Sequence, residues 1–142
     1  MTLERTYAMI KPDAVAAGHV GEIVAAIEAS GLRIRGLQLV RLSPAQVRGF
    51  YAVHVEKSFF PVLMEFMTSG PVVAMVLEGP AAITRWRALM GPTDPSRAEA
   101  DALRARFGTD ITRNAVHGSD APQTAAEEIA YIFGGRVLDG LV

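Results

Sequence analysis

The sequence predicts an α/β protein, an α+β sandwich in which helices pack around one antiparallel sheet. Three observations lead to this fold class. The length of 142 residues suits a single domain spanning 1–142. The composition is 50% hydrophobic, which is enough to form a buried core. Segments with the helical period also alternate along the chain with segments of the β type.

The first three expected elements are a strand, a helix and a second strand. Residues Thr6–Ile10 are mostly apolar and β-capable, and Pro12 ends the strand. Across Val20–Ala29 the apolar residues recur at i, i+3, i+4 and i+7, which places them on one face of an amphipathic helix. Leu32–Leu42 alternates apolar and polar residues, as in a strand with one polar face. The alternation slips at Gly36, which predicts a β-bulge.

The rest of the chain predicts two more strands and further helices. A capping box of Ser43 and Gln46, with Pro44 at N1, begins a helix that should run to about Ala52. The remaining expected elements are, in chain order, a helix over Pro61–Thr68, a fully apolar central strand over Val72–Leu77, a helix from Gly79 to Met90, a helical turn within Ala98–Phe107, a short strand over Asn114–Ser119 and a helix over Pro122–Ile132 capped by Asp120 or Ser119. Without the extra helices the order is βαββαβ, the ferredoxin-like plan, with a four-stranded antiparallel sheet.

The composition excludes several classes of protein. Because the chain has no cysteines, it has no disulfides, zinc fingers, iron–sulfur clusters or thiol nucleophile. Fourteen basic side chains oppose fifteen acidic ones, so nucleic acid is not expected as a main partner. Met1–Lys11 does not form a signal peptide, and the apolar run Pro71–Leu77 is too short to span a membrane, so the expected location is cytoplasmic. The apolar excess favours buried subunit interfaces, and hence a homo-oligomer.

Phosphate chemistry in this chain would depend on side chains, because the sequence has neither a P-loop nor a Gly-x-Gly-x-x-Gly pattern. Of the three histidines, His19 and His54 have the local sequence of surface residues. His117 is followed by a glycine, which allows unusual backbone angles or the close approach of a ligand, and then by Ser119 and Asp120 as polar partners. Imidazole is a nucleophile near neutral pH when another group fixes its tautomer. The spacing by itself leaves an ordinary turn histidine as an open alternative.

The segment Asn114–Asp120 resembles the Asn-x-[Ile/Val]-His-Gly-Ser-Asp signature of nucleoside diphosphate kinases. Other segments resemble the same family in the same order along the chain. They are the opening strand and loop Thr6–Val15, the aromatic pairs Phe50–Tyr51 and Phe59–Phe60 followed by Pro61, and Met90–Pro95, which resembles a Gly-x-Thr-[Asn/Asp]-Pro stretch. Because the matches extend over nearly the whole chain, it is identified as a member of this family. The resemblance implies a ferredoxin-like α/β sandwich.

The resemblance also implies a ping-pong reaction. The γ-phosphate of a nucleoside triphosphate, usually ATP, would pass to a nucleoside diphosphate, which maintains nucleoside triphosphate pools. The phosphohistidine is expected at His117, attacking through Nδ1. Glu128 matches the glutamate that orients this histidine, and Ser119 is expected to support Glu128. Tyr51 matches a tyrosine whose hydroxyl would hold Lys11 in place.

The phosphates are expected to lie among cations, since phosphoryl transfer depends mostly on positioning and on neutralising the equatorial oxygens. Lys11, Arg87 and Arg104 each match a phosphate-contacting position of the family, and the Thr93 hydroxyl is expected to donate to a phosphate oxygen. Mg²⁺ is implied as the cofactor, bound mainly by nucleotide phosphates and water and not by a metal site of the protein. From the residues alone, the arginines also fit solvated helix faces, and Thr93 fits a helix cap.

The nucleoside is expected to bind loosely, because stacking tolerates any base. Phe59 resembles the stacking aromatic residue of the family and Ile111 the aliphatic residue on the opposite side, whereas Phe60 is expected in the core. Asn114, assisted by Lys11, would hydrogen-bond the ribose hydroxyls.

The chain departs from the family pattern in two places. Asp101–Phe107 keeps an arginine but lacks the proline and glycine of a loop that typically contributes to subunit contacts. The resemblance implies a homotetramer or, alternatively, a homohexamer. The segment Gly135–Val142 lacks the family's frequent acidic end, and its apolar side chains are expected to cover a neighbouring subunit or the core.

Two other classes of function are open at the level of sequence. A catalytically silent nucleotide-binding or regulatory module would be expected to lack His117, Lys11 or Glu128, and all three are present. A nucleic-acid-binding protein would use a basic groove, and the net charge of −1 argues against strong binding of that kind.

Overall fold

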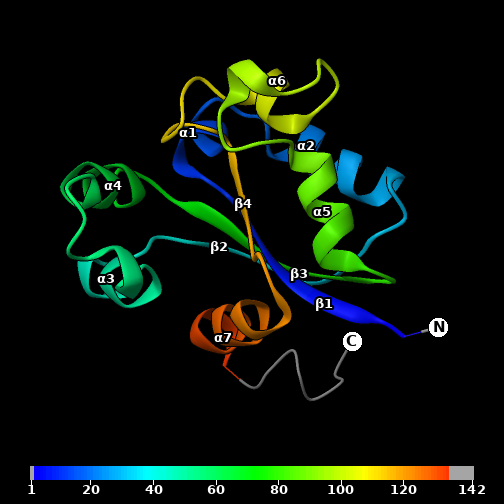
Figure 1. Ribbon diagram of the computed structural model, residues 1–142, viewed down its shortest axis with the longest axis horizontal. Coiled ribbons are helices and arrows are strands. Elements are labelled where there is room, and N and C mark those ends of the chain that lie inside the picture. Colours follow the sequence, from blue (N-terminus) through cyan, green and yellow to red (C-terminus); the bar gives the residue numbers. More distant parts are fainter. Residues whose placement is uncertain (1, 135–142) are drawn as a thin grey trace.

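The computed structural model describes residues 2–134 and is built around one four-stranded antiparallel sheet (Figure 1). Helices separate the first strand from the second and the third from the fourth, as the βαββαβ plan requires, and the extra helices between the second and third strands were also expected, so the predicted fold class is confirmed. The segment 135–142, expected to cover a neighbouring subunit or the core, lies outside the described residues. The strands are β1 (Glu4–Ile10), β2 (Arg33–Val40), β3 (Val72–Gly79) and β4 (Val116–Gly118), in the spatial order β2-β3-β1-β4.

Helices cover both faces of the sheet. They are α1 (Pro12–Ala16), α2 (Val20–Ala29), α3 (Pro44–Phe50), α4 (Phe60–Met67), α5 (Ala82–Met90), α6 (Leu103–Phe107) and α7 (Pro122–Phe133), with 3₁₀ turns at Ala52–His54 and Pro95–Arg97. The sequence does not predict α1. Pro12 follows β1 and occupies the first turn of this helix, where its missing N–H costs no hydrogen bond. Within residues 2–134, no helix is long and apolar enough to cross a membrane.

The sheet carries a separate hydrophobic core on each face. On one face, alternate residues of β1 and β3, such as Ile10 and Met75, pack with side chains of α1, α2, α5 and α6. On the other face, the intervening residues, such as Met9 and Val76, pack with side chains of α3, α4 and α7. This division follows from the strand period of two residues. It also explains why the central strand β3 is apolar almost throughout, since both of its faces are covered.

Two local signals lie where the sequence predicts them. At the start of α3, the Ser43 hydroxyl accepts a 3.1 Å hydrogen bond from the Gln46 N–H, and the Gln46 side chain accepts a 2.9 Å bond from the Ser43 N–H. The capping box is therefore present. The register of β2 against β3 shifts between Ile34 and Gly36, which confirms the predicted bulge.

Several helix boundaries differ from the prediction by one to three residues, and the cap of α7 differs as well. The N-cap of α7 is Ala121, and not Asp120 or Ser119. The Thr124 hydroxyl donates to Asp120 Oδ1 at 2.7 Å and lies 3.1 Å from the Ala121 N–H, so Thr124 connects Asp120 to the start of the helix. In the loop after α5, the helical turn lies at Leu103–Phe107, within the predicted range, and a separate 3₁₀ turn forms earlier in the loop.

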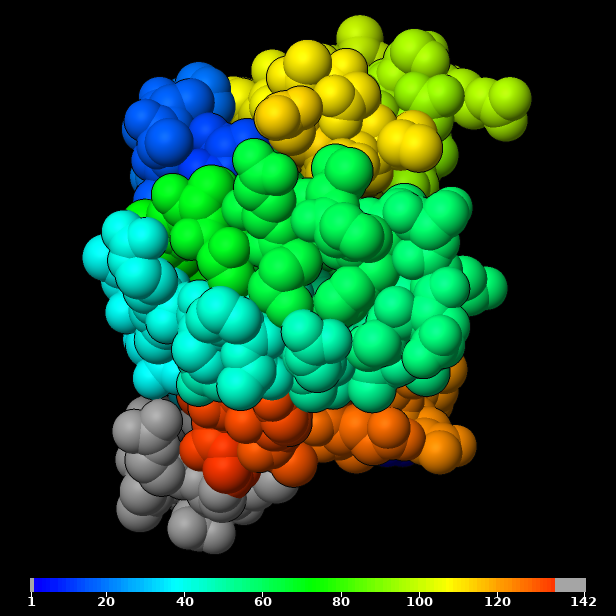
Figure 2. Space-filling model, turned by 90° about the vertical axis from the view of Figure 1, so that its left-hand side faces the viewer, coloured from blue at the N-terminus to red at the C-terminus, as the bar shows by residue number. Residues whose placement is uncertain are grey.

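The α3–α4 region forms a broad wall of the molecule. On the face seen in Figure 2, the residues of α3 and α4 make a continuous band between α7 on one side and the segment that includes α6 on the other. The band continues into β2, which is an edge strand of the sheet. Two apolar side chains of this strand are exposed, Leu37 at 53% and Leu39 at 65%.

Candidate active site

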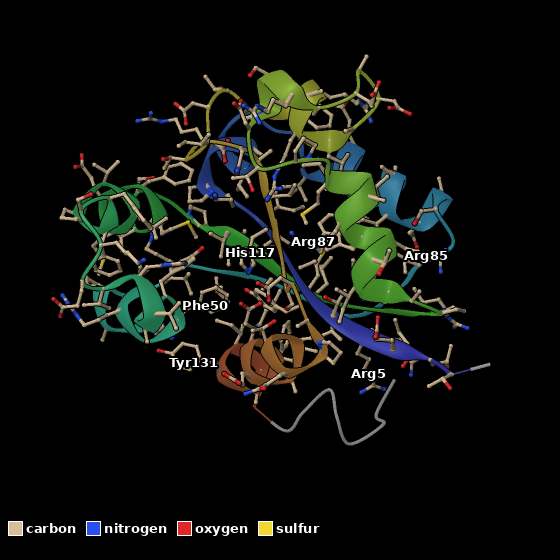
Figure 3. All side chains as sticks on the ribbon, viewed as in Figure 1. Arg5, Phe50, Arg85, Arg87, His117 and Tyr131 are labelled. Atoms are coloured by element: carbon tan, nitrogen blue, oxygen red, sulfur yellow. The ribbon has the colours of Figure 1, made fainter. Side chains whose placement is uncertain are left out.

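His117 lies in the middle of β4, the short strand beside β1. It stands directly opposite Met9 in the antiparallel register, and residues paired in this way share a face of the sheet. The imidazole is therefore on the face covered by α3, α4 and α7. Figure 3 shows His117 near the middle of the molecule, with Phe50 of α3 on one side and Arg87 of α5 on the other.

A chain of hydrogen bonds fixes the ring of His117. Its Nε2 lies 3.2 Å from Oε1 of Glu128, on α7, and the same carboxylate oxygen accepts a 2.7 Å hydrogen bond from the Ser119 hydroxyl. A carboxylate at Nε2 favours the tautomer with its proton on that nitrogen, which leaves a lone pair on Nδ1. The fold thus brings together three predicted site residues and leaves Nδ1 as the ring nitrogen with a free lone pair.

Aromatic rings surround this imidazole. The ring centroids of Phe50, Tyr7 and Tyr51 lie 5.3, 6.0 and 6.2 Å from that of His117. Burial, with a smaller contribution from Glu128, raises the pKa of Tyr51, so its hydroxyl stays protonated. The rings limit rotation of the imidazole and keep water from part of its surface.

His54 is a residue of this site that the sequence interpretation misses. It lies in the 3₁₀ turn after α3 and lines a cavity of about 240 Å³ together with His117 and Arg87. Its ring centroid is 6.3 Å from Tyr51 and 5.4 Å from Phe59, and its Nδ1 is buried without a partner in the described part of the chain. Its polar neighbours in sequence suggest a surface residue. The available signal was its position between Tyr51 and Phe59, which the resemblance had already selected.

Gly118 is required for packing and not for an unusual backbone angle. Its φ is not positive. A Cβ at this position would lie 2.5 Å from the indole of Trp86 and 2.8 Å from the end of Met90. The Trp86 indole Nε1 also donates a 3.1 Å hydrogen bond to the backbone carbonyl of His117. The expectation of unusual backbone angles is therefore wrong, and a close neighbour of this glycine is the Trp86 indole. Gly118 also lines a cavity with His117, so close approach of a ligand stays a prediction.

Lys11 follows β1, and its ammonium group is buried. Nζ donates two hydrogen bonds of 2.9 Å, to the Thr112 carbonyl and to Oδ1 of Asn114. Burial and the nearby Arg104 guanidinium lower the pKa of Lys11 to about 8. The expected hydrogen bond between Tyr51 and Lys11 is absent from the described structure, in which the Tyr51 ring packs against the imidazole of His117. That expectation was wrong.

Asn114 is buried and holds three segments of the site together. Its Oδ1 accepts from Lys11, and its Nδ2 donates to the carbonyls of Thr93 at 3.0 Å and Ile111 at 3.2 Å. Both amide hydrogens are then engaged. The amide oxygen keeps a second lone pair, which is able to accept from a hydroxyl.

The two predicted arginines border a second cavity, of about 600 Å³, together with Thr93. Arg104 is 8% exposed and donates 2.9 Å hydrogen bonds to the carbonyls of Gly91 and Val116, while its Nε has no partner among the described residues. Burial and nearby Arg87 lower the pKa of Arg104 to about 10, so it remains charged at neutral pH. Arg87 is exposed and lines both cavities. Two adjacent guanidinium groups suit a multiply charged anion.

Phe59 and Ile111 present apolar surface to solvent, with 48% and 65% of each residue exposed. Phe60, the next residue after Phe59, is 6% exposed and packs in the core, as predicted. The exposed ring and the exposed aliphatic side chain have the character required for stacking on a base of any kind.

The residues of the site suit phosphate better than a bare metal ion. Within residues 2–134 there is no group of three or more His, Asp or Glu side chains able to hold a metal. The side chains assigned to phosphate are cations and a hydroxyl, whereas Mg²⁺ requires oxygen ligands. A divalent ion therefore fits this cleft when nucleotide phosphates supply its ligands.

Residues 4–137 match the family model described as "Nucleoside diphosphate kinase". The chain belongs to the nucleoside diphosphate kinase family. The resemblance found in the sequence is thereby confirmed, and membership makes the chain a nucleotide-binding kinase, a class of phosphotransferase.

Relatives and solved structures of this family match over most of their length. The nucleoside diphosphate kinase of Desulfovibrio desulfuricans is 57% identical over 133 residues, which are 94% of this chain and 96% of the relative. The crystal structure of the Aquifex aeolicus nucleoside diphosphate kinase has a TM-score of 0.92 at 45% identity, covering 95% of this chain and 98% of that one. The Halobacterium salinarum nucleoside diphosphate kinase in complex with CDP has a TM-score of 0.90 at 41% identity, covering 93% and 88%.

Proposed function

We propose that this chain transfers the γ-phosphate of a nucleoside triphosphate, usually ATP, to a nucleoside diphosphate through a phosphohistidine at His117. The observation that carries the proposal is the hydrogen-bond chain from Ser119 through Glu128 to His117, beside a cleft bordered by two arginines. The relatives, all named nucleoside diphosphate kinase, support the same reaction. Such an exchange maintains the pools of nucleoside triphosphates.

In the first step, Nδ1 of His117 attacks the γ-phosphorus in line with the leaving oxygen. The N–P bond forms as the P–O bond to the β-phosphate breaks, and a nucleoside diphosphate leaves. Glu128 stabilises the positive charge that the ring gains, and Ser119 holds the carboxylate in place. In the second step a different nucleoside diphosphate enters, and its β-phosphate oxygen takes the phosphoryl group back from Nδ1. One site serves both steps.

The phosphates are proposed to lie among Arg87, Arg104, Lys11 and Thr93. The exposed guanidinium of Arg87 supplies N–H donors for the equatorial oxygens, and the buried guanidinium of Arg104 adds positive charge beside them. Mg²⁺, bound through the nucleotide phosphates and water, supplies further neutralisation of their charge.

The nucleoside is proposed to lie between Phe59 and Ile111, with its ribose near Asn114 and Lys11. Exposed apolar side chains that make no specific polar contacts accept purines and pyrimidines alike. The second lone pair of the Asn114 amide oxygen and the Lys11 ammonium supply partners for ribose hydroxyls. The complex of the Halobacterium salinarum relative with CDP supports nucleotide binding in this fold.

Incubation with γ-labelled ATP and Mg²⁺ tests the proposal. The protein should acquire a label that is lost in acid and retained in base, and should then pass it to several nucleoside diphosphates. His117→Gln should remove the label, whereas His19→Gln, at a histidine far from the cleft in sequence, should retain it. Labelling that persists in His117→Gln would contradict the assignment of the nucleophile.

We propose that the chain forms a homo-oligomer, a tetramer or alternatively a hexamer. The support is the edge strand β2, which pairs with one strand only within residues 2–134 and exposes Leu37 and Leu39 for contact with a second copy. Light scattering should give a multiple of the chain mass. Leu37→Asp with Leu39→Asp should reduce that mass, and an unchanged mass would exclude this edge as a subunit contact.

We propose a cytoplasmic location, where the nucleotide substrates are found. The absence of a membrane-crossing helix in residues 2–134 is compatible with it. Fractionation of cells should recover the chain and its activity with the cytoplasmic enzymes, and recovery in the membrane pellet would contradict the proposal.

A further inference from the structure

Ala115, two residues before His117, has a left-handed backbone. Its φ is 75°, and the residue is fully buried. A residue with a Cβ rarely adopts this conformation, because the Cβ crowds the following carbonyl oxygen. Such strain persists only where the surrounding structure holds the backbone in place.

The segment Lys11–Asp13 holds Ala115 from both sides. The Ala115 N–H donates a 3.0 Å hydrogen bond to Oδ2 of Asp13, and the Ala115 carbonyl accepts a 2.8 Å bond from the backbone N–H of Lys11. The second bond uses only main-chain atoms. Asp13 is therefore the side chain on which the conformation of Ala115 depends.

The carboxyl group of Asp13 is partly buried and has few hydrogen-bond partners among the described residues. Burial raises the pKa of its carboxyl above the ordinary value, against the opposing effect of backbone N–H donors and of Lys11. Its second oxygen, Oδ1, is buried and has no hydrogen-bond partner within residues 2–134. The main hydrogen bond of this carboxylate to a distant part of the chain is therefore the one that it accepts from the Ala115 N–H.

The left-handed turn at Ala115 sets where β4 begins. Asn114, before the turn, is hydrogen-bonded to Lys11, and Val116, after it, begins the three-residue strand that carries His117. Figure 1 shows α1, which contains Asp13, beside the start of β4. One backbone conformation therefore fixes the position of His117 relative to Asn114.

We propose that Asp13 is a positioning residue for phosphoryl transfer, which keeps Ala115 left-handed and so aligns His117 with a nucleotide held near Asn114. The inference rests on the proposed role of His117 as phosphate acceptor. Asp13 lies outside the reacting groups and acts through the backbone of Ala115. The competing interpretation is that Asp13, in the first turn of α1, serves only to stabilise that helix.

A set of four variants separates these interpretations: Asp13→Ala, Asp13→Asn, Ala115→Gly and the double variant Asp13→Ala with Ala115→Gly. Glycine adopts a positive φ without a Cβ penalty, so Ala115→Gly removes the need for the Asp13 contact. Asparagine keeps an oxygen able to accept from the Ala115 N–H. Glu28→Ala, at an exposed carboxylate of α2, is the control for loss of one negative charge.

The readouts are the rate of phosphoenzyme formation at saturating ATP and Mg²⁺, the KM for ATP, and unfolding by urea. Asp13→Ala should slow phosphorylation about 10- to 100-fold, the range expected for a small misplacement of a reacting group. KM should change less than kcat. Asp13→Asn and the double variant should recover most of the rate, and Glu28→Ala should match the wild type.

Each outcome decides the proposal. A wild-type rate in Asp13→Ala, or a double variant that is folded and as slow as Asp13→Ala, would overturn it. If Asp13→Ala does not fold, the double variant gives the answer: a folded, active double variant supports the coupling of residues 13 and 115, and an unfolded or inactive one refutes it. If the wild type acquires no label from γ-labelled ATP, or if His117→Gln still acquires it, the proposed function itself has failed.

Discussion

The indole Nε1 of Trp86 donates a hydrogen bond to the backbone carbonyl of His117, with a nitrogen–oxygen distance of 3.1 Å. The imidazole of His117 lies on one face of the sheet, with α7, and Trp86 packs in the core on the opposite face. His117 is thus held from two sides, by Glu128 on its ring and by Trp86 on its main chain. Gly118 makes the second contact possible, because a Cβ there would collide with the indole.

Trp86→Phe should therefore weaken both the fold and the catalytic step. Phenylalanine fills most of the buried volume but leaves the His117 carbonyl without this donor, which costs about 1–3 kcal/mol in the free energy of unfolding. We expect a severalfold lower rate of phosphoenzyme formation and a KM for ATP close to that of the wild type. Urea unfolding and single-turnover kinetics provide the two measurements.

A spectroscopic experiment on the unaltered protein examines the same contact. Trp86 is the only tryptophan of the chain, so intrinsic fluorescence reports on it alone. Its emission should change when His117 is phosphorylated by ATP and return when a nucleoside diphosphate is added. An emission spectrum identical before and after phosphorylation would mean that the Trp86 contact does not sense the state of His117.

Glu128→Gln should be more damaging than its modest change in size suggests. The amide N–H₂ is able to donate to Nε2 of His117, which favours the tautomer with its proton on Nδ1 and removes the nucleophilic lone pair. We expect a loss in kcat on the order of a hundredfold. Ser119→Ala should cost less, since it removes a support of the carboxylate and not the carboxylate itself. Glu127→Gln, the exposed neighbour on α7, is the matched control and should retain wild-type kcat.

The elements of the fold were largely predictable, because their signals are local. The helical period of Val20–Ala29 matches the observed helix end to end. The capping box at Ser43 and the slip at Gly36 likewise depend on residues close in sequence. The N-cap of α7 was missed because the Asp120 carboxylate accepts a hydrogen bond from the Thr124 hydroxyl, one turn into the helix.

The residues around the candidate site were expected from the sequence, except His54, whereas the contacts between them were less predictable. The resemblance selected the contacts of Glu128 with His117 and Ser119, but not the hydrogen bond between Lys11 and Asn114. Tyr51 packs on His117 and Lys11 binds Asn114, because the packing of α3 and of the loop before β4 decides these partners. Contacts between distant parts of the chain, such as Asp13 with Ala115, leave no trace in local sequence pattern.

The activity should decline as the pH rises through about 8, the pKa that burial gives Lys11. Above that pH the amine is neutral and loses its charge toward phosphate and its full set of donors, so the KM for nucleotides should rise. In Lys11→Gln, KM should already be high at pH 7, and this rise with pH should be absent. Lys57→Gln, at the other lysine and on the surface, should keep the wild-type profile. A wild-type KM that stays constant from pH 7 to pH 10 would contradict the role of this charge.

The same pKa predicts that stability changes with pH in the direction opposite to activity: as the pH rises, Lys11 stabilises the fold more. The unfolded chain has a lysine pKa near 10.5, and the folded chain has one of about 8. Between these values the unfolded state binds more protons, so the contribution of Lys11 to the free energy of unfolding increases as the pH rises from about 8 to about 10.5. The difference between wild type and Lys11→Gln, measured by urea unfolding across this range, isolates the contribution of Lys11 from other titrating groups.

Arg87 and Arg104 should differ in what their removal does. Arg104→Ala leaves the carbonyls of Gly91 and Val116 without their donors, at a cost of about 1–3 kcal/mol for each unsatisfied group, and should lower both stability and kcat. Arg87 is exposed, so Arg87→Ala should reduce kcat by on the order of a hundredfold while the urea midpoint changes little. Arg97→Ala, at an arginine whose side chain is 82% exposed, should change neither quantity. Equal losses of stability in the Arg87 and Arg104 variants would contradict this division, and full activity in both would remove the arginines from the phosphate site.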